Sequence, residues 1–257
     1  MAVGGAKEFE PDSPWEALRD FARGRREGTA EAVANRVQEL ILGRDLPDGA
    51  RLPSERDLAA LLSTSRPTVS QAIRTLVVRG LVESRRGSGA YVRLRPEATL
   101  AASMGLMLER EPESVGQLAE VRLTLESSAV VRAIERATPE ELALAEEALR
   151  AFADSGGDTA SWMSADTRFH ATLVSAAHNT YLASMFDSVH TTLINHEYRT
   201  WIDNGTVPDW LAPDRIPALT AIHEPILDAV RRRDVESALY AVRHHHEAMR
   251  ANLLRGG

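Results

Sequence analysis

The sequence contains no cysteine, and this absence limits the chemistry open to the protein. Disulfide bonds, thiolate zinc sites and cysteine nucleophiles are excluded, so any metal ion must be held by histidines and carboxylates. The chain also lacks the roughly 18 consecutive apolar residues of a membrane span. Residues 1–28 contain no apolar signal core. We therefore expect a cytoplasmic protein with no membrane partner.

A basic excess is confined to one short segment of the chain. The net charge is −7, yet residues 29–95 hold 11 arginines and 7 acids, whereas residues 96–257 hold 14 basic and 24 acidic residues. All eight histidines, from His170 to His246, lie in the acidic part. A length of 257 residues suits two ordinary domains. This distribution predicts two domains with different tasks.

The basic segment is expected to form three helices followed by a β-hairpin. Apolar residues recur with helical spacing from Thr29 to Gly43. A second helix is predicted in LPSERDLAALL, where Ser54 and Asp57 have the spacing of a capping box. A third follows in RPTVSQAIRTLVVRG. The strand-like segments LVESR and AYVRL then flank a turn at 86–89. This order of elements is that of a winged helix-turn-helix.

The segment LPSERDLAALLSTSRPTVSQAIRTLVVRGLVESRRGSGAYV resembles the DNA-binding domain of the GntR family of transcription regulators. The resemblance implies DNA contacts from the starts of the second and third helices and from the hairpin turn, because helix N-termini and arginines suit phosphates and guanine edges. The implied residues are Arg56, Arg66, Thr68, Ser70, Arg86, Gly87, Ser88 and Gly89. Many relatives have an arginine in place of Ser70, so we expect a different operator. The alternative for the three arginines is a solvated basic surface.

Two segments lie outside the expected DNA-binding domain (29–95) and the expected second domain (101–257). Residues 96–100, which begin with a proline, are predicted to be a linker. Residues 1–28 form an N-terminal extension. Four of its apolar residues have the spacing of a short amphipathic helix, namely Trp15, Leu18, Phe21 and Ala22.

The second domain is expected to be all-helical, which makes the chain mainly α. Its apolar residues follow helical spacing, and no alternating strand pattern of any length occurs. Six or seven helices fit the length, packed as an antiparallel bundle whose interior can hold a site made from facing helices. Pro225 is unfavourable inside a helix, so a helix either begins near His223 or is kinked there.

Asp166 and His170 have the spacing of two metal ligands on one helix. Residues four apart lie on the same face, about one turn from each other. With His223 and His245 on other helices, they would form an oxygen and nitrogen site suited to zinc, nickel or manganese. The spacing alone often arises by chance, and a single histidine on an amphipathic helix is more often a core or surface residue.

Four segments of this domain resemble successive signatures of the FadR-type (FCD) effector domain: LAEVRLTLESSAVVRAI, DTRFHATLVSAAHN, AIHEPILDAV and DVESALYAVRHHHEAM. The resemblance implies that Asp166, His170, His223 and His245 bind one divalent cation, with zinc as the first expectation. Alignment of the motif selects His245 from three consecutive histidines, which would point about 100° apart on a helix.

The same resemblance implies a pocket for a small-molecule effector. Arg122 corresponds to an arginine that often faces this pocket, where it would pair with a carboxylate. A salt bridge to Glu126, one turn further on, is the alternative. Asn179 and Arg199 are further candidates for binding the effector.

These features predict a homodimeric transcription regulator rather than an enzyme. It would bind an inverted repeat in double-stranded DNA, as a repressor, and a small organic acid at the metal-containing pocket would control its affinity for the operator. One alternative is a His/Asp metal-dependent hydrolase with an appended DNA-binding domain. The sequence nominates no general base for such an enzyme. Another alternative is a helical protein-interaction module.

Overall fold

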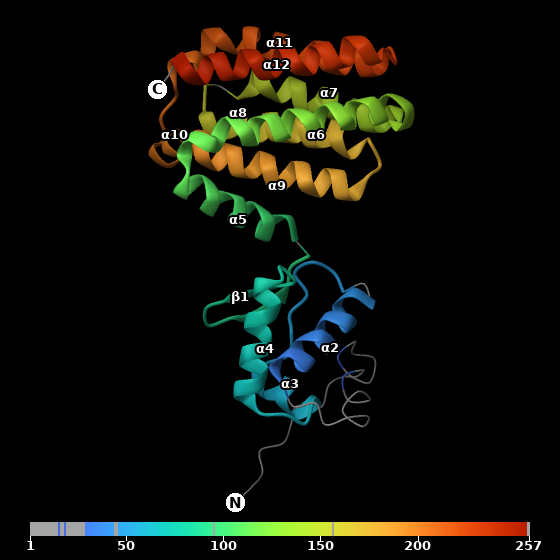
Figure 1. The fold of residues 1–257 in the computed structure, drawn as a ribbon, viewed down its shortest axis with the longest axis vertical. Helices are drawn as coiled ribbons and strands as arrows, with labels where there is room; N and C mark the ends of the chain where they lie inside the picture. The colour runs from blue at the N-terminus through green and yellow to red at the C-terminus, as the bar shows by residue number, and fades with distance from the viewer. Residues whose placement is uncertain are drawn as a thin grey trace, which may run out of the picture. The chain divides into compact units, whose positions relative to one another are not determined.

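The computed structural model describes residues 15, 18, 29–43, 46–94, 96–155 and 157–255. The chain divides into two compact units, residues 1–99 and 100–257, which we describe separately (Figure 1). Over the described ranges it is mainly helical, as the sequence predicts, and its strands form one two-stranded sheet. None of the described helices is both long and apolar enough to cross a membrane.

The N-terminal unit has the predicted order of three helices and a hairpin. The elements are α2 (Ala30–Gly43), α3 (Glu55–Leu61), α4 (Arg66–Val78), β1 (Val82–Arg85) and β2 (Gly89–Val92). Ser54 and Ser65 cap α3 and α4, since their side chains accept hydrogen bonds from backbone N–H groups of the first turn. Beyond α4, Gly80 adopts φ +70°, which ends the helix at little cost.

The hairpin forms the wing of this unit. β1 and β2 are antiparallel, with Val82 opposite Val92 and Arg85 opposite Gly89. The turn between them needs glycine, because Gly87 and Gly89 adopt φ +74° and +117°, where other residues are strained. The prediction of a winged helix-turn-helix is therefore confirmed.

Two residues of the N-terminal extension belong to the core of this unit. Trp15 and Leu18 join the cluster of buried apolar side chains from α2, α3, α4 and the hairpin. Leu18 is fully buried. Phe21 and Ala22, and with them most of the predicted amphipathic helix, lie outside the described residues.

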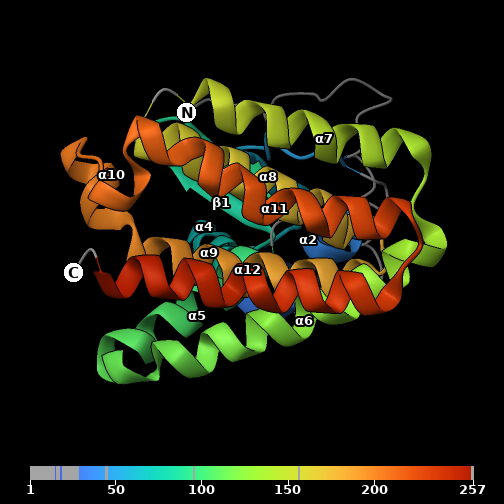
Figure 2. The ribbon, with the colours of Figure 1, turned by 90° about the horizontal axis from the view of Figure 1, so that it is seen from above.

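The second unit is all-helical over the residues that can be described. Its α-helices are α5 (Pro96–Arg110), α6 (Val115–Arg136), α7 (Pro139–Asp154), α8 (Thr159–Ser175), α9 (Thr180–Glu197), α10 (Arg199–Asn204), α11 (Ile216–Arg231) and α12 (Val235–Arg255). The bundle consists of α6 to α9, α11 and α12. Within it α7 packs against α8, α11 against α12, and α6 against both α9 and α12. Figure 2 shows α11 and α12 side by side.

Two prolines, Pro96 and Pro225, lie within helices. Residues 96–100, predicted as a linker, are helical, because Pro96 is the first residue of α5. A proline there costs nothing, since the N–H that it lacks would have no helical partner. Of the two alternatives for Pro225, a helix that begins near His223 is ruled out, because α11 begins at Ile216 and Pro225 lies inside it.

Large aromatic side chains of the bundle pack around one of the candidate ligands. The ring centroids of Phe152, Phe169 and Trp162 lie 4.7, 5.5 and 6.1 Å from that of His223. All three aromatic side chains are fully buried. The hydrophobic core therefore encloses the candidate site and excludes water from its inner side.

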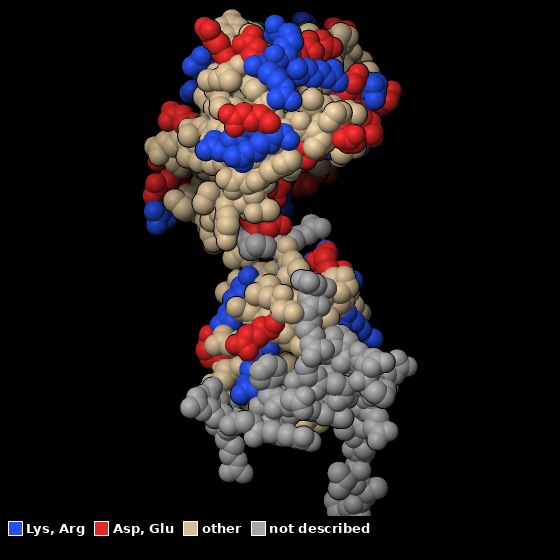
Figure 3. Space-filling model, turned by 90° about the vertical axis from the view of Figure 1, so that its right-hand side faces the viewer, with Lys and Arg blue, Asp and Glu red and all other residues tan. Residues whose placement is uncertain are grey.

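Surface charges contribute little to holding the bundle together. Acidic and basic side chains are interspersed on the face of the helical unit seen in Figure 3. For example, Glu146 lies 3.4 Å from Arg150 and 2.6 Å from Arg231. Exposed pairs of this kind are worth about 0–1 kcal/mol each. Burial of the aromatic and aliphatic core must supply most of the stability.

The contribution of helix capping to stability can be measured at the start of α7. Thr138 and Glu141 form a reciprocal capping box, in which each side chain binds the backbone N–H of the other residue. Thr138→Ala should lower the free energy of unfolding by about 1 kcal/mol. Urea unfolding followed by tryptophan fluorescence will measure this, because three of the four tryptophans lie in this unit. Thr200→Ala, at an exposed position of α10, should cause no loss; an equal loss would contradict the capping role.

Candidate functional site

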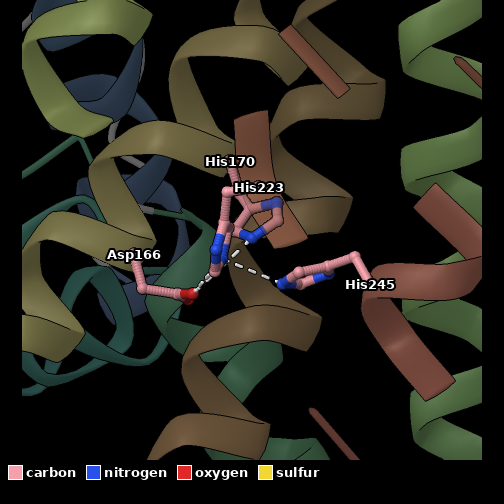
Figure 4. Close-up of side chains that lie close together, drawn as sticks. All are labelled: Asp166, His170, His223 and His245. Carbon is pink, nitrogen blue, oxygen red and sulfur yellow. Dashed lines mark hydrogen bonds and ion pairs between the residues drawn. The ribbon is translucent and has the colours of Figure 1, made fainter. Parts of the chain in front are cut away.

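The four predicted metal ligands meet inside the bundle (Figure 4). Asp166 and His170 lie one turn apart on α8, His223 lies on α11, and His245 lies on α12. One oxygen or nitrogen atom from each residue lies within 4.8 Å of the other three. All four side chains are buried. The consecutive helices α11 and α12, together with α8 from earlier in the chain, thus supply one compact group of ligand atoms.

The atoms at the centre of this group carry lone pairs that face one another. His223 Nδ1 donates to the backbone carbonyl of Leu219 at 2.7 Å, so in the neutral ring Nε2 is an acceptor. This Nε2 lies 3.1 Å from Asp166 Oδ1 and 2.9 Å from His245 Nε2. His170 Nε2 is buried without a hydrogen-bond partner. Lone pairs that converge in a dry interior are stabilised by a cation, so these residues fit a divalent metal ion.

Glu126 of α6 supports the cluster, and the sequence analysis considered it only as a partner of Arg122. Its carboxylate accepts a hydrogen bond from His170 Nδ1. This leaves His170 Nε2 free to face the cluster, as in the carboxylate–histidine pairs that orient metal ligands. Its second oxygen lies 2.7 Å from His246 Nε2. Glu126 could have been noticed because it falls on the buried face of α6, with Val130 and Ala133.

The carboxylates and imidazoles shift one another's proton affinities. Burial favours the neutral form of Glu126 and Asp166, but the adjacent histidines outweigh it and hold both pKa values well below the usual range. Burial also lowers the pKa of His170, yet the two carboxylates raise it to about 9. For His245, burial and the neighbouring His223 hold the pKa well below its ordinary value. The two carboxylates therefore stay ionised and His245 stays neutral, whereas the surroundings of His170 favour a positive charge, either a proton or a metal ion.

The remaining histidines differ in how close they lie to this cluster. His244 is exposed and stacks on Tyr240, and His178 pairs with Glu141 at the surface, with its side chain 45% exposed. His190 is buried, with Nε2 only 4.0 Å from Asp166 Oδ2. Of these residues, His178 and His244 are the ones that stand apart from the candidate metal site.

A cavity of about 250 Å³ opens beside the candidate ligands and includes Asp166 and His245 in its wall. Arg122 also lines it, with Nε and Nη2 buried and without hydrogen-bond partners. Its nearest carboxylate oxygen is Glu126 Oε2, at 4.0 Å from Nε. Arg122 thus lines the cavity and also lies within ion-pair distance of Glu126, while its pairing with an effector stays a prediction. Glu197 lines the cavity too, where burial raises its pKa to about 7 against the opposing effect of Arg122.

The other two effector candidates do not reach this cavity. Asn179 is the N-cap of α9, where its side-chain oxygen accepts from the backbone N–H of Leu182 at 3.1 Å. Arg199 is exposed and pairs with Asp203, one turn along α10, at 3.3 Å. Both residues therefore have structural roles here, and neither lines the pocket. Their assignment to effector binding therefore stays a prediction that this cavity does not support.

The predicted DNA-contacting residues lie on three elements of the N-terminal unit. Arg56 is on α3, the residues at 66, 68 and 70 are on α4, and those at 86–89 form the turn of the wing and the first residue of β2. The three arginines are exposed. Two further residues, for which the sequence carries no motif signal, hold the turn. Arg51 Nη2 donates to the carbonyl of Ser88 at 2.8 Å, and the hydroxyl of Tyr91 lies 2.6 Å from that of Ser88.

A winged helix-turn-helix joined to a helical unit with a cavity beside a buried His and Asp cluster defines a transcription regulator with separate DNA-binding and sensing domains. Residues 29–92 match the family described as bacterial regulatory proteins, gntR family, and residues 117–248 match the FCD domain. The chain belongs to the gntR family, with an FCD domain as its second domain. Both resemblances noted in the sequence are confirmed, and the hydrolase alternative finds no support.

Named relatives have the same character. The HTH-type transcriptional repressor NanR of Salmonella newport is 30% identical over 256 residues, covering 97% of this chain and 94% of that protein. An Escherichia coli K12 protein with the provisional name L-lactate dehydrogenase operon regulatory protein is 30% identical over 224 residues, covering 84% and 83%. The structure of Streptococcus agalactiae GntR matches with a TM-score of 0.65 and 25% identity, covering 86% of this chain and 99% of that one.

Removal of one ligand should remove the metal and its contribution to stability. We expect about one divalent ion per chain in the wild type, measured by elemental analysis, because four preorganised ligands bind it. A metal at roughly 100-fold its Kd stabilises the folded state by about 2.7 kcal/mol. Chelation should therefore lower the Tm of the wild type but leave that of His170→Ala unchanged.

His178→Ala and His244→Ala are the matched controls, since both residues lie apart from the cluster. They should keep the metal and the response to chelation. Retention of a full complement of metal by variants of all four ligands would disprove the site. Loss of metal from His244→Ala, with retention in His245→Ala, would show instead that the ligand on α12 has been misassigned.

Proposed function

We propose that this regulator represses transcription as a homodimer in the cytoplasm, and that a small organic acid, bound beside a divalent metal ion, changes its affinity for DNA. The observation that carries the proposal is the cavity of about 250 Å³, where Arg122 meets two candidate ligands, Asp166 and His245. Such a volume suits a metabolite smaller than a typical drug. A ligand that favours one arrangement of the dimer shifts DNA affinity by its difference in binding free energy.

Zinc is the metal that we expect, with nickel or manganese as alternatives. Asp166, His170, His223 and His245 would hold it through three nitrogens and one oxygen, a set that zinc commonly accepts. A bound cation would attract a carboxylate and fix the wall of the cavity. The residues around it support the ligands, because Glu126 orients His170 and the Leu219 carbonyl orients His223.

Arg122 is the residue that we assign to the carboxylate of the effector. A guanidinium binds carboxylates through parallel N–H donors, and two of the nitrogens of this one have no hydrogen-bond partner in the protein. Arg122 also lies next to Glu126, which in turn contacts His170. An acid that pairs with Arg122 would therefore act on the residues that hold the metal.

The proposed homodimer matches the proposed operator, an inverted repeat in DNA. Two copies of α4 in successive major grooves require an inverted repeat. Apolar side chains that could contribute to an interface are exposed on the effector unit, among them Leu106 and Met107 of α5, at 67% and 65%. Burial of such residues against a second copy would remove them from water.

Two arginines test the DNA-binding assignments. Arg66→Ala should weaken binding to an operator recovered by site selection by roughly 1–3 kcal/mol, with a smaller loss on random DNA, if Arg66 reads a base. Arg86→Ala should weaken both similarly and reduce the salt slope by about 1, because it neutralises a phosphate. Fluorescence anisotropy over a salt series measures both effects.

Arg150→Ala is the control for these variants, since Arg150 is exposed on α7 of the other unit. It should change neither affinity nor salt slope. An unchanged ratio of operator to random affinity in Arg66→Ala would make Arg66 a phosphate contact. A loss confined to the operator in Arg86→Ala would contradict its role in the wing.

Arg122→Ala should reduce effector binding without removing the metal. A hydrogen bond to a charged group is worth about 1.5–3 kcal/mol, so affinity should fall by at least roughly tenfold. Thermal shift of metal-loaded protein against a panel of small mono- and dicarboxylic acids identifies acids that stabilise the wild type, and the same acids are then titrated into the variant. Arg199→Ala, outside the cavity, should respond like the wild type. Equal stabilisation of Arg122→Ala would contradict the assignment.

A further inference from the structure

The outward face of α4 is formed by residues that the sequence analysis did not assign to DNA. Val69, Ala72, Ile73 and Leu76 are the buried residues of this helix. The helical period places Pro67, Gln71, Arg74 and Val78 on the opposite side, at i, i+4, i+7 and i+11. All four of these residues are exposed. Arg66 and Ser70 lie toward one flank of this face, so Gln71 and Arg74 are the long polar side chains at its centre.

Gln71 and Arg74 are joined by hydrogen bonds on this face. Arg74 donates to Gln71 Oε1 from Nη2 at 2.7 Å and from Nε at 3.2 Å. Its Nη1 donates to Ser70 Oγ at 3.3 Å. Arg74 thus orients the side chains of Ser70 and Gln71.

These bonds determine which end of the Gln71 amide is available to a partner. A guanidinium has only N–H donors, so the amide oxygen must be the atom that faces Arg74. The Nε2 group of Gln71, with its two donors, is left for another partner. A free glutamine would use both ends of its amide on adenine, accepting from N6 and donating to N7. Held in this way, Gln71 can donate but has little capacity left to accept.

We propose that Gln71, oriented by Arg74, reads a guanine in each half of the operator and so replaces the arginine that is absent at position 70. Guanine presents two adjacent acceptors, N7 and O6, in the major groove. Adenine presents N7 beside an amino donor, which would have no acceptor on Gln71. Ser70 is too short to take this role, and its hydroxyl already accepts from Arg74. Gln71 is thus the base-contacting residue, and Arg74 is a positioning residue.

This inference rests on the proposed binding of DNA, and a selection experiment separates the two. Full-length wild type, Gln71→Glu and Arg74→Ala are each used to enrich sites from a library of random duplexes, and the enriched sites are sequenced. The wild type should enrich an inverted repeat. In each half-site, one position should prefer guanine, and this preference should change when residue 71 is substituted. Substitution of that base should weaken wild-type binding roughly tenfold.

The two variants should change this position in different ways. Gln71→Glu keeps the length of the side chain and the contact with Arg74 but removes both donors, so guanine should be lost and cytosine, which offers a donor, should be favoured. Arg74→Ala frees the amide oxygen, so the preference should move from guanine to adenine. A residue that merely stabilised α4 would change affinity without changing the preferred base.

Gln117→Glu makes the same chemical change at an exposed position of α6 and should leave the enriched sequence unaltered. Selection of identical sites by Gln71→Glu and the wild type would overturn the role of Gln71. An unaltered guanine preference in Arg74→Ala would overturn its positioning role. Failure of the wild type to enrich any sequence would remove the proposed DNA binding itself, and with it this inference.

Discussion

The contact between Glu126 and His170 is the interaction on which the rest of the effector unit depends. Two carboxylates, Glu126 and Asp166, are buried in the bundle, and a buried charge is costly unless it is paired. Each one is adjacent to histidines from other helices. Consequently α6, α8, α11 and α12 must pack in one arrangement to satisfy these groups. The same contacts therefore fix both the packing of these helices and the geometry of the site.

The aromatic residues around the cluster strengthen this constraint. Phe152 and Phe169 separate His223 from water, and electrostatic attraction is stronger where water is excluded. On the other side, the cavity lined by Arg122 gives access to the cluster. A group with one dry side and one accessible side can hold an ion tightly and still respond to a second ligand.

Much of the fold could be predicted because its signals are local. Serine caps, glycine stops and helical spacing define the helix-turn-helix, and the spacing of Asp166 and His170 places them on one face of α8. A local signal that fits two structures is harder to interpret. Pro96 suits both a linker and the first turn of a helix, and it begins α5.

Residues that depend on which helices meet were the hardest to predict. Glu126 approaches His170 only because α6 packs beside α8, and no spacing along the chain reveals that contact. The family resemblance supplied the partners of Asp166 on α11 and α12, which periodicity alone left open. Asn179 and Arg199 lie outside the cavity, and a motif position does not by itself fix where a side chain points.

The burial of Trp15 and Leu18 means that the folding unit of the DNA-binding domain is larger than its evolutionary unit. The family match begins at residue 29, whereas the hydrophobic core of the domain includes residues 15 and 18. Sequence outside the shared segment therefore helps to set the stability of the shared fold. Selection can act on that extension and alter how firmly the domain is folded, while the residues that face DNA stay the same.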